Sequence, residues 1–323
     1  MEKTVAQKLY YLMYLGREFE YAAKEYYLKG NISGFLHLDI GQEGFSVAAM
    51  QAFRKGDVFT TYREHVLSIA RGMEPKKIMA ELFGKESGVS KGRGGSMHLF
   101  EPKLDFYGGD AIVAGQIVNA VGCAYARKYQ ESENAVMVIF GDGASNAGAF
   151  FESINIASAW QLPLLFLCEN NEYAIGTKIT RVSHFKKQSN KAKPYMRTIE
   201  VDGMDAIAVY EAVEEANRYI LDGNGPCFVE AMTCRYEGHS IADPNSYRSA
   251  EEMDICKQKD PIKRLKKTLI QEYGLNSTVL DNLEKKAKET VEEAVEFAKN
   301  SKEPEISSLY ENVYCKECGN VVS

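Results

Sequence analysis

The segment from residue 135 to residue 168 places the strongest constraint on how this chain can fold. The apolar run AVMVIF (135–140) predicts a buried strand, GDGASNAG predicts a turn, and AFFESINIASAW (149–160) predicts a helix. Pro163 ends that helix, and LLFLC (164–168) predicts a second buried strand. Two strands joined through a helix run parallel, so this pattern is one βαβ unit. We therefore predict an α/β fold with a parallel sheet and helices on both of its faces.

Other segments of the chain fit the same architecture. Apolar residues on one face of residues 5–28 predict an N-terminal helix, which Gly30 ends. Further helices are predicted at 43–53, 75–84, 206–221 and 279–299, and a further strand at 227–232. We expect a single domain over residues 1–323, with a helical extension at about 260–300 and a loose tail at about 301–323.

The bulk composition excludes several classes of protein. With 45% hydrophobic residues among 323, the chain can bury a sizeable core. The net charge of −6 argues against nucleic acid as the main partner, because phosphate binding needs a basic face. No apolar run reaches roughly 18 residues, so we expect no membrane-spanning helix. The N-terminus has no features of a signal or transit peptide, and we expect a cytoplasmic protein.

The seven cysteines stand at positions 123, 168, 227, 234, 256, 315 and 318. An odd number without a framework spacing predicts reduced thiols in an intracellular protein. Cys315 and Cys318 are the only close pair, and one such pair is at most half of a zinc site.

Two segments have an unusual composition. Residues 88–109 are too rich in glycine for regular structure, and a loop of this length is often functional. Residues 181–197 contain six basic residues and no acidic one in an otherwise acidic chain. Two interpretations of this basic segment stay open, a solvated loop and a mobile loop near an anionic ligand.

Polar residues follow both strands of the predicted βαβ unit. Gly141, Asp142 and Gly143 come after the first strand, and residues 169–173 (ENNEY) come after the second. Ligands bind beyond the carboxyl ends of parallel strands, and carboxylate, amide and carbonyl oxygens suit magnesium with a bound phosphate. The glycines let backbone N–H groups approach that phosphate. A dinucleotide fingerprint is excluded, because its third glycine would fall at Asn146.

The Gly-Asp-Gly turn is followed by 26 residues (144 to 169) and then by two asparagines. This spacing resembles the thiamin diphosphate motif. The chain from about residue 5 to 265 resembles the alpha subunit of the first component of 2-oxo-acid dehydrogenase complexes, which implies the thiamin-diphosphate-binding fold. The stretches that carry the resemblance are GFLHLDIGQEG (34–44), TYREHV (61–66), MAELFGKESGVSKGRGGSMHLF (79–100), FYGGDAIVAGQ (106–116), GDGASNAGAFFESINIASAW (141–160), CENNEYAIGT (168–177), VDGMD (201–205) and RYEGHSIADPNSYRS (235–249).

The resemblance implies ligands for the metal and the diphosphate. Asp142, Asn171 and the carbonyl of Tyr173 would hold Mg²⁺ on the cofactor diphosphate. Gly143 and Ala144 would line that diphosphate through their backbone. These five residues all follow the two strands of the βαβ unit.

The resemblance also implies contacts from two segments that come earlier in the chain. Tyr62 and Arg63 would reach the diphosphate. Ala111 and Val113 match positions whose backbone meets the aminopyrimidine ring, although many family members have glycine where Ala111 stands. A backbone contact would tolerate that small change.

Two histidines match active-site positions of the family. His37 and His239 would lie near the reacting carbon, and His239 would also contact the cofactor. Glu237 stands where many members have histidine, which changes the charge beside His239. Thiamin diphosphate would supply the carbanion and the electron sink, and a positioned histidine would orient substrate and move protons.

The resemblance implies partners and substrate. A glutamate from a separate pyrimidine-binding module activates the cofactor in this family, and the chain is too short to contain both modules. A beta subunit must supply the missing half, with two copies of each chain, and a lipoyl-bearing dihydrolipoyl acyltransferase would take the acetyl group. The HLDIGQEG stretch sets branched-chain members aside and favours pyruvate. An acetoin dehydrogenase alpha subunit and a non-catalytic cofactor-binding paralogue are the alternatives.

Overall fold

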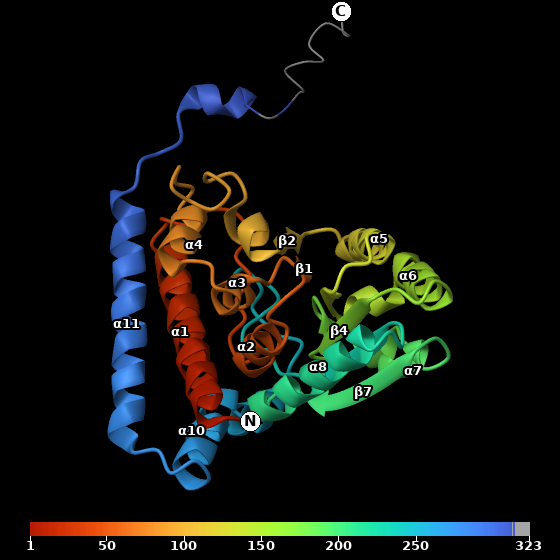
Figure 1. Ribbon diagram of the computed structural model, residues 1–323. Coiled ribbons are helices and arrows are strands. Elements are labelled where there is room, and N and C mark those ends of the chain that lie inside the picture. Colours follow the sequence, from red (N-terminus) through yellow and green to blue (C-terminus); the bar gives the residue numbers. More distant parts are fainter. Residues whose placement is uncertain (312, 314–323) are drawn as a thin grey trace, which may run out of the picture.

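A parallel sheet forms the centre of the computed structural model, which describes residues 1–311 and residue 313. Its six strands follow the order β2-β1-β3-β4-β8-β7, and every neighbouring pair is parallel (Figure 1). The predicted α/β fold with a parallel sheet is confirmed. The strands of this sheet are β1 (Asp57–Thr61), β2 (Phe106–Asp110), β3 (Val136–Gly141), β4 (Leu164–Asn170), β7 (Arg197–Asp202) and β8 (Cys227–Met232), and β5 (Tyr173–Ala174) pairs with β6 (Thr177–Lys178) in a separate antiparallel pair.

Six helices lie close to positions that the sequence predicts, whereas α3, α5, α7 and α9 were not predicted. The predicted helices at 5–28, 43–53, 75–84, 149–160, 206–221 and 279–299 correspond to α1, α2, α4, α6, α8 and α11. The α-helices are α1 (Lys3–Leu28), α2 (Glu43–Ala52), α3 (His65–Arg71), α4 (Pro75–Leu82), α5 (Gly115–Tyr129), α6 (Gly148–Ala159), α7 (Ser189–Ala192), α8 (Ala206–Leu221), α9 (Ala250–Gln258), α10 (Pro261–Gln271) and α11 (Ser277–Asn300). None of the helices in the described ranges is both long and apolar enough to cross a membrane.

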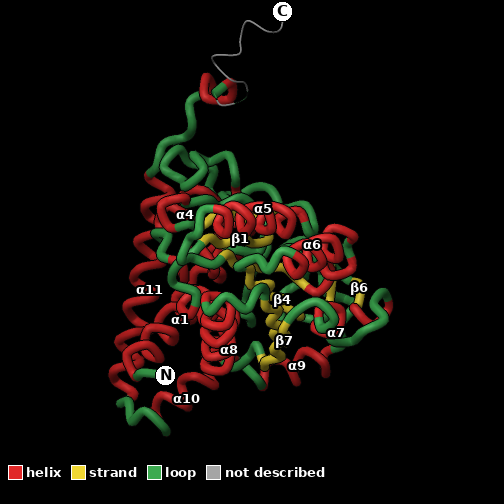
Figure 2. The backbone as a smooth tube through the Cα atoms, turned by 45° about the vertical axis from the view of Figure 1, so that its right-hand side comes forward, coloured by secondary structure: helices red, strands yellow, loops and turns green. Residues whose placement is uncertain are grey.

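Helices cover both faces of the sheet because side chains alternate along each strand. Val138 and Phe140 of β3 pack with α5 and α6 in one apolar cluster. Met137 and Ile139 point to the other face and pack in a second cluster with α1, α2 and α8. Figure 2 shows the strands enclosed between these helices. The carboxyl ends of β3 and β4 are left free for a binding site.

The glycine-rich segment contains one strand that the sequence analysis did not predict. We expected no regular structure over residues 88–109, and this is wrong for β2 (Phe106–Asp110). Parallel pairing with β1 supplies the backbone hydrogen bonds that the local sequence does not indicate. Gly108 has a φ of +74°, and a Cβ there would lie 2.5 Å from the carbonyl oxygen of Leu99. Glycine is therefore required by close backbone approach within the strand.

The prediction of reduced thiols is wrong for one pair of cysteines. Cys234 and Cys256 form a disulfide, with their Cα atoms 6.1 Å apart. Their spacing of 22 residues gave no signal, because only the tertiary fold brings α9 back to the end of β8. The other three described cysteines, at 123, 168 and 227, are free. Cys315 and Cys318 lie outside the described residues.

The expected loose tail has contacts in its described part. The backbone N–H of Glu86 donates to the carbonyl of Lys302 at 3.0 Å, and the hydroxyl of Ser87 donates to that of Ser301 at 2.7 Å. A short 3₁₀ helix, η5 (Ile306–Tyr310), follows beyond the end of α11 (Figure 1). The loop after α4 therefore holds the beginning of the tail.

A buried ion-pair network joins three helices at the side of the sheet. Arg17 of α1 donates to Glu43 of α2 at 2.7 Å and to Asp260, the N-cap of α10, at 3.1 Å. All three side chains are buried, and Glu43 also accepts from the backbone N–H of Gly41 at 3.1 Å. Removal of a buried arginine that pairs with two carboxylates leaves their negative charges uncompensated.

We predict that Arg17→Met lowers the free energy of unfolding by about 3–5 kcal/mol, because two buried carboxylates lose their cation. Urea denaturation of the full chain measures this change. Arg264→Met is the matched control, since Arg264 pairs with Asp202 and Asp205 at the surface. That control should lose about 1 kcal/mol or less. Equal losses of unfolding free energy in the two variants would show that the buried Arg17 network contributes no more to stability than a surface ion pair.

Candidate active site at the carboxyl ends of β3 and β4

A cavity of about 190 Å³ lies at the carboxyl ends of β3 and β4. Most of the site residues that the sequence predicts line it, namely Tyr62, Arg63, Val113, Asp142, Gly143, Ala144, Asn171, Tyr173 and His239. Two predicted residues do not line the cavity. His37 lies directly behind it, with its ring centroid 4.6 Å from that of Tyr62, and Ala111 lies outside it near the start of α5.

One end of the cavity offers oxygen ligands. Asp142 follows β3 and is 1% exposed, and within the described chain its Oδ2 has no hydrogen-bond partner. Burial raises the pKa of Asp142 to about 7. A buried carboxylate oxygen without a partner needs a proton or a cation, and the amide of Asn171 lines the same cavity. This set of oxygens fits a small hard cation such as Mg²⁺.

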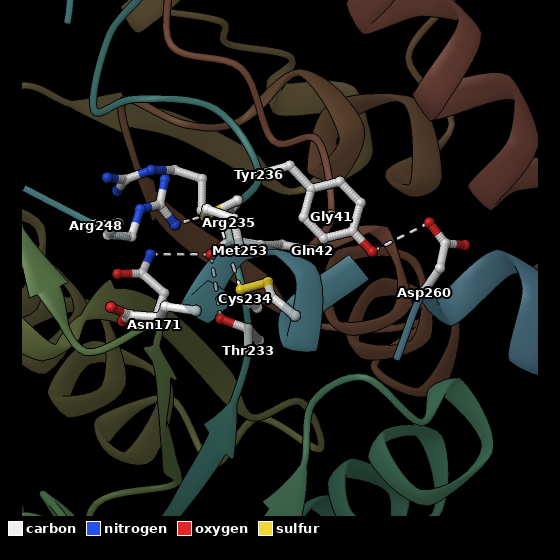
Figure 3. Close-up of a disulfide and its surroundings, with 12 residues drawn as sticks. Gly41, Gln42, Asn171, Thr233, Cys234, Arg235, Tyr236, Arg248, Met253 and Asp260 are labelled. Carbon is white, nitrogen blue, oxygen red and sulfur yellow. Dashed lines mark hydrogen bonds between the residues drawn. A yellow bond between two sulfur atoms is a disulfide. The ribbon is translucent and has the colours of Figure 1, made fainter. Parts of the chain in front are cut away.

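Contacts from the second strand end orient the asparagines. Asn170 donates to the buried carboxylate of Glu230 at 2.7 Å. Asn171 donates to Oε1 of Gln42 at 2.9 Å, and Thr233 donates to the same oxygen at 3.1 Å (Figure 3). Because its N–H is held by Gln42, the amide of Asn171 turns its oxygen toward the loop that contains Tyr173, whose N–H lies 3.2 Å away.

The turn that contains Asp142 is supported from the basic segment. Lys191 is 8% exposed and donates to the carbonyl of Ser145 at 3.1 Å and to the side chain of Asn146 at 2.7 Å. The hydroxyl of Ser145 in turn donates to the carbonyl of Asp142 at 2.7 Å. Residues 181–197 are therefore more than a solvated loop, because one of their lysines holds this turn in place.

The middle of the cavity suits an anionic group. A Cβ on Gly143 would lie 2.6 Å from the Cβ of Ala174, so only glycine leaves room there. Helix α5 begins at the cavity wall, and among the described residues no side chain caps its first N–H groups. Arg63 and Arg235 are 5% and 2% exposed and bring two positive charges to the wall. Backbone donors, a helix N-terminus and guanidinium groups together favour a phosphate-bearing ligand.

Two histidines and a tyrosine form an aromatic cluster at the far end. The ring centroid of His37 is 5.2 Å from that of His239, and the ring of Tyr62 lies 5.6 Å from His239. Burial, together with the nearby Arg63 guanidinium, lowers the pKa of His239 to about 4 and that of His37 to about 2. Both rings are therefore neutral near pH 7, and each offers one hydrogen-bond donor and one acceptor.

Comparison of the sequence with known proteins places the chain in one family. Residues 11–307 match the family model described as dehydrogenase E1 component. The chain is 40% identical to the pyruvate dehydrogenase E1 component subunit alpha of Rickettsia conorii, covering 94% of each chain. It is 41% identical to the subunit of that name from Porphyra purpurea, over 93% of this chain and 90% of the relative. A chloroplastic alpha-3 subunit of Arabidopsis thaliana is 40% identical over 98% of this chain and 76% of its own length.

The chain belongs to the dehydrogenase E1 component family. Membership of this family implies thiamin diphosphate as cofactor and a beta subunit as partner. The cavity has the features that such a cofactor needs, an oxygen-rich end followed by a cationic middle.

Sequence reasoning missed two residues that line the cavity in this E1 family member, Arg235 and Glu169, and it missed the backbone contacts of the predicted residue Arg63. Arg235 follows β8, the strand beside β4, and the strand-end rule could have found it. Glu169 lines the cavity with its carboxyl oxygen Oε1 unpartnered within the described residues, and burial raises its pKa well above the usual value. Arg63 donates to the carbonyls of Leu38 and His239 at 2.6 and 2.8 Å. Arg63 therefore joins the two segments that contain the active-site histidines.

A buried hydrogen-bonded chain behind His37 was also missed. Glu20 of α1 lies 2.9 Å from Nδ1 of His65, whose Nε2 lies 2.8 Å from the hydroxyl of Ser96. Ser96 accepts from the backbone N–H of His37 at 3.4 Å, and Glu20 accepts from that of Asp39 at 2.9 Å. No local signal reveals this chain, because its members come from separate segments of the sequence.

We predict that His239→Gln reduces the loss of stability on acidification. The unfolded chain binds a proton at His239 near pH 6.5, whereas the folded chain binds it only near pH 4. Stability must therefore fall as the pH falls through this window, and glutamine removes that contribution. Urea unfolding of the cofactor-free chain at pH 7.5 and pH 5 measures the effect. If wild type and variant lose the same free energy of unfolding between the two pH values, the pKa of His239 is not lowered in the folded chain.

Proposed function

We propose that this chain is the alpha subunit of a pyruvate dehydrogenase. In the assembled enzyme it would oxidatively decarboxylate pyruvate and pass the acetyl group to a lipoyl domain. The observation that carries the proposal is the buried carboxylate of Asp142, whose Oδ2 has no partner in the part of the chain that the structure describes, and which shares a cavity with Asn171 at two adjacent strand ends. The names of relatives at about 40% identity over nearly the whole chain support pyruvate as the substrate.

The cofactor would lie along the cavity. Thiamin diphosphate supplies the nucleophilic carbon and the electron sink for decarboxylation. Its diphosphate would bind Mg²⁺ held by Asp142, Asn171 and the carbonyl of Tyr173. The backbone of Gly143 and Ala144 would receive the phosphate oxygens, because no side chain fits between that turn and Ala174.

Other residues of the cavity would orient the cofactor and the substrate. Tyr62 and Arg63 would reach the diphosphate, and the backbone of Ala111 and Val113 would meet the aminopyrimidine. Since both site histidines are neutral near pH 7, they can hydrogen-bond to the substrate and orient it without adding charge.

A beta subunit would cover an apolar surface at the carboxyl ends of α5 and α6. Tyr125 and Tyr129 of α5 and Trp160, which follows α6, are 50%, 81% and 53% exposed. The rings of Tyr125 and Trp160 lie 5.4 Å apart, so these side chains gather rather than scatter. A gathered apolar surface that is exposed to solvent indicates an interface. We infer two copies of each chain and a lipoyl-bearing acyltransferase as the acetyl acceptor.

The test of function compares the purified chain with the assembled alpha–beta enzyme. With an artificial electron acceptor, the chain alone should be inactive, and the assembled enzyme should prefer pyruvate to 2-oxobutyrate, a branched 2-oxo acid and acetoin in kcat/KM. A preference of about tenfold or more in kcat/KM for acetoin, which is within the discrimination that a substrate pocket achieves, would favour the acetoin dehydrogenase alternative. Cofactor binding without turnover would indicate the non-catalytic paralogue. The cytoplasmic location stays a prediction, since one relative is chloroplastic.

We predict that Asp142→Ala weakens binding of thiamin diphosphate with Mg²⁺ by more than about tenfold, because even outer-shell losses at metal sites cost about 10–100-fold. Calorimetry on the assembled wild-type and variant enzymes measures the dissociation constant. Glu172→Gln is the matched control, since it removes one negative charge from the loop of Asn171 and Tyr173 without removing a proposed ligand. If both variants bind like wild type, Asp142 is not a metal ligand.

A further inference from the structure

The Cys234–Cys256 bridge lies at the base of the segment that closes the cavity. Cys234 comes two residues after the end of β8 and directly before Arg235, which lines the cavity. Cys256 belongs to α9, and Figure 3 shows the bridge beneath Arg235 and Arg248. Cys256 is 6% exposed, whereas Cys234 is only half-buried. A thiol reagent can therefore approach the pair from the side of Cys234.

The bridge closes a ring of chain that includes His239. Inside this ring, Arg248 donates to the carbonyl of Glu237 at 2.6 Å, and the N–H of His239 donates to Asp243 at 2.6 Å. Arg235 donates to the hydroxyl of Tyr247 at 3.0 Å. The ring is held together by polar contacts of its own. It meets the rest of the chain through the carbonyl of His239, which accepts from Arg63 at 2.8 Å, and through the N–H of Ile241, which donates to the carbonyl of Leu36 at 3.0 Å.

Helix α9, which forms one end of the ring, has little apolar packing of its own. Cys256 is the single buried residue among Ala250–Gln258. A polar contact joins the helix to the proposed metal site, because the hydroxyl of Tyr173 donates to Glu252 at 2.9 Å. An element with so few buried contacts has low local stability, so a covalent link at its buried residue has a large effect on it.

We propose that Cys234 and Cys256 form a reversible dithiol–disulfide site that controls how firmly the segment from Arg235 to Met253 closes on the cavity. In the bridged state α9 is fixed to the end of β8, and His239 and Tyr173 are held in place. In the reduced state α9 is released, and the segment opens more often. Only the identity of the ligand in the cavity rests on the proposed function.

The chemistry is thiol–disulfide exchange with a small-molecule disulfide such as oxidised glutathione. The Cys234 thiolate attacks one glutathione sulfur, which forms a mixed disulfide and releases one glutathione thiolate. The Cys256 thiolate then attacks the Cys234 sulfur, which forms the protein disulfide and releases the second glutathione. The two protein thiols lose two electrons and two protons in total, and the glutathione disulfide is reduced to two thiols.

The test uses the full chain assembled with its beta subunit, prepared once with oxidised glutathione and once with dithiothreitol. Peptide mass spectrometry measures the fraction of bridged Cys234–Cys256. Hydrogen exchange of the cofactor-free enzyme measures opening of residues 236–253, and calorimetry measures binding of thiamin diphosphate with Mg²⁺.

We expect reduction to speed exchange in residues 236–253 by about tenfold or more, because a cross-link over a ring of this size strongly restricts opening. Exchange in β3 should not change, and cofactor binding should weaken severalfold. Cys256→Ser should behave like the reduced enzyme and lose its response to glutathione. Cys123→Ser, which removes a free thiol on α5, should keep that response.

Two results would overturn the inference. One is the absence of a bridged peptide after treatment with oxidised glutathione, and the other is equal exchange in the two redox states. If Cys256→Ser does not fold, titration of the wild-type enzyme with dithiothreitol gives the same comparison. Redox-dependent exchange without binding of thiamin diphosphate would support the cysteine site and refute the proposed function. Cofactor binding with equal hydrogen exchange in the two redox states would support the proposed function and refute the cysteine site.

Discussion

The in-register parallel pairing of β3 and β4 determines where the functional groups of this protein meet. Gly141 pairs with Glu169, so the residues that follow each strand emerge at the same edge of the sheet. Asp142 and Asn171 then face one cavity although the helix α6 separates them in the sequence. Both faces of the sheet are packed by helices, and this leaves the strand ends as the natural place for a ligand.

Burial of charge around this edge is balanced by contacts from distant segments. Arg63 is buried, and it joins the segments of His37 and His239 through the backbone carbonyls of Leu38 and His239. Farther from the cavity, Arg17 compensates the buried carboxylates of Glu43 and Asp260. Isolated charges at such depth would be strongly unfavourable, so these contacts fix the relative positions of the segments that they join.

The fold was largely predictable because its signals are local. Apolar runs with turns and helices between them identified β3, β4 and β8, and the Gly-Asp-Gly turn with its asparagines identified one end of the cavity. Strands β1, β2 and β7 were missed, and β2 gave no strand signal because its glycines are required by close backbone approach rather than by strand propensity. The chain from Glu20 through His65 to Ser96 and the Cys234–Cys256 bridge depend on contacts between segments far apart in sequence. Sequence pattern alone does not encode such contacts.

The most direct test of the account is the position of the metal. Crystals of the assembled enzyme with thiamin diphosphate and Mn²⁺ in place of Mg²⁺ would give an anomalous signal at the metal alone. The account predicts one peak at the ends of β3 and β4, about 2.0–2.3 Å from a carboxylate oxygen of Asp142, the amide oxygen of Asn171 and the carbonyl of Tyr173. A peak that these three residues do not ligate, or a cofactor bound outside the cavity, would contradict it.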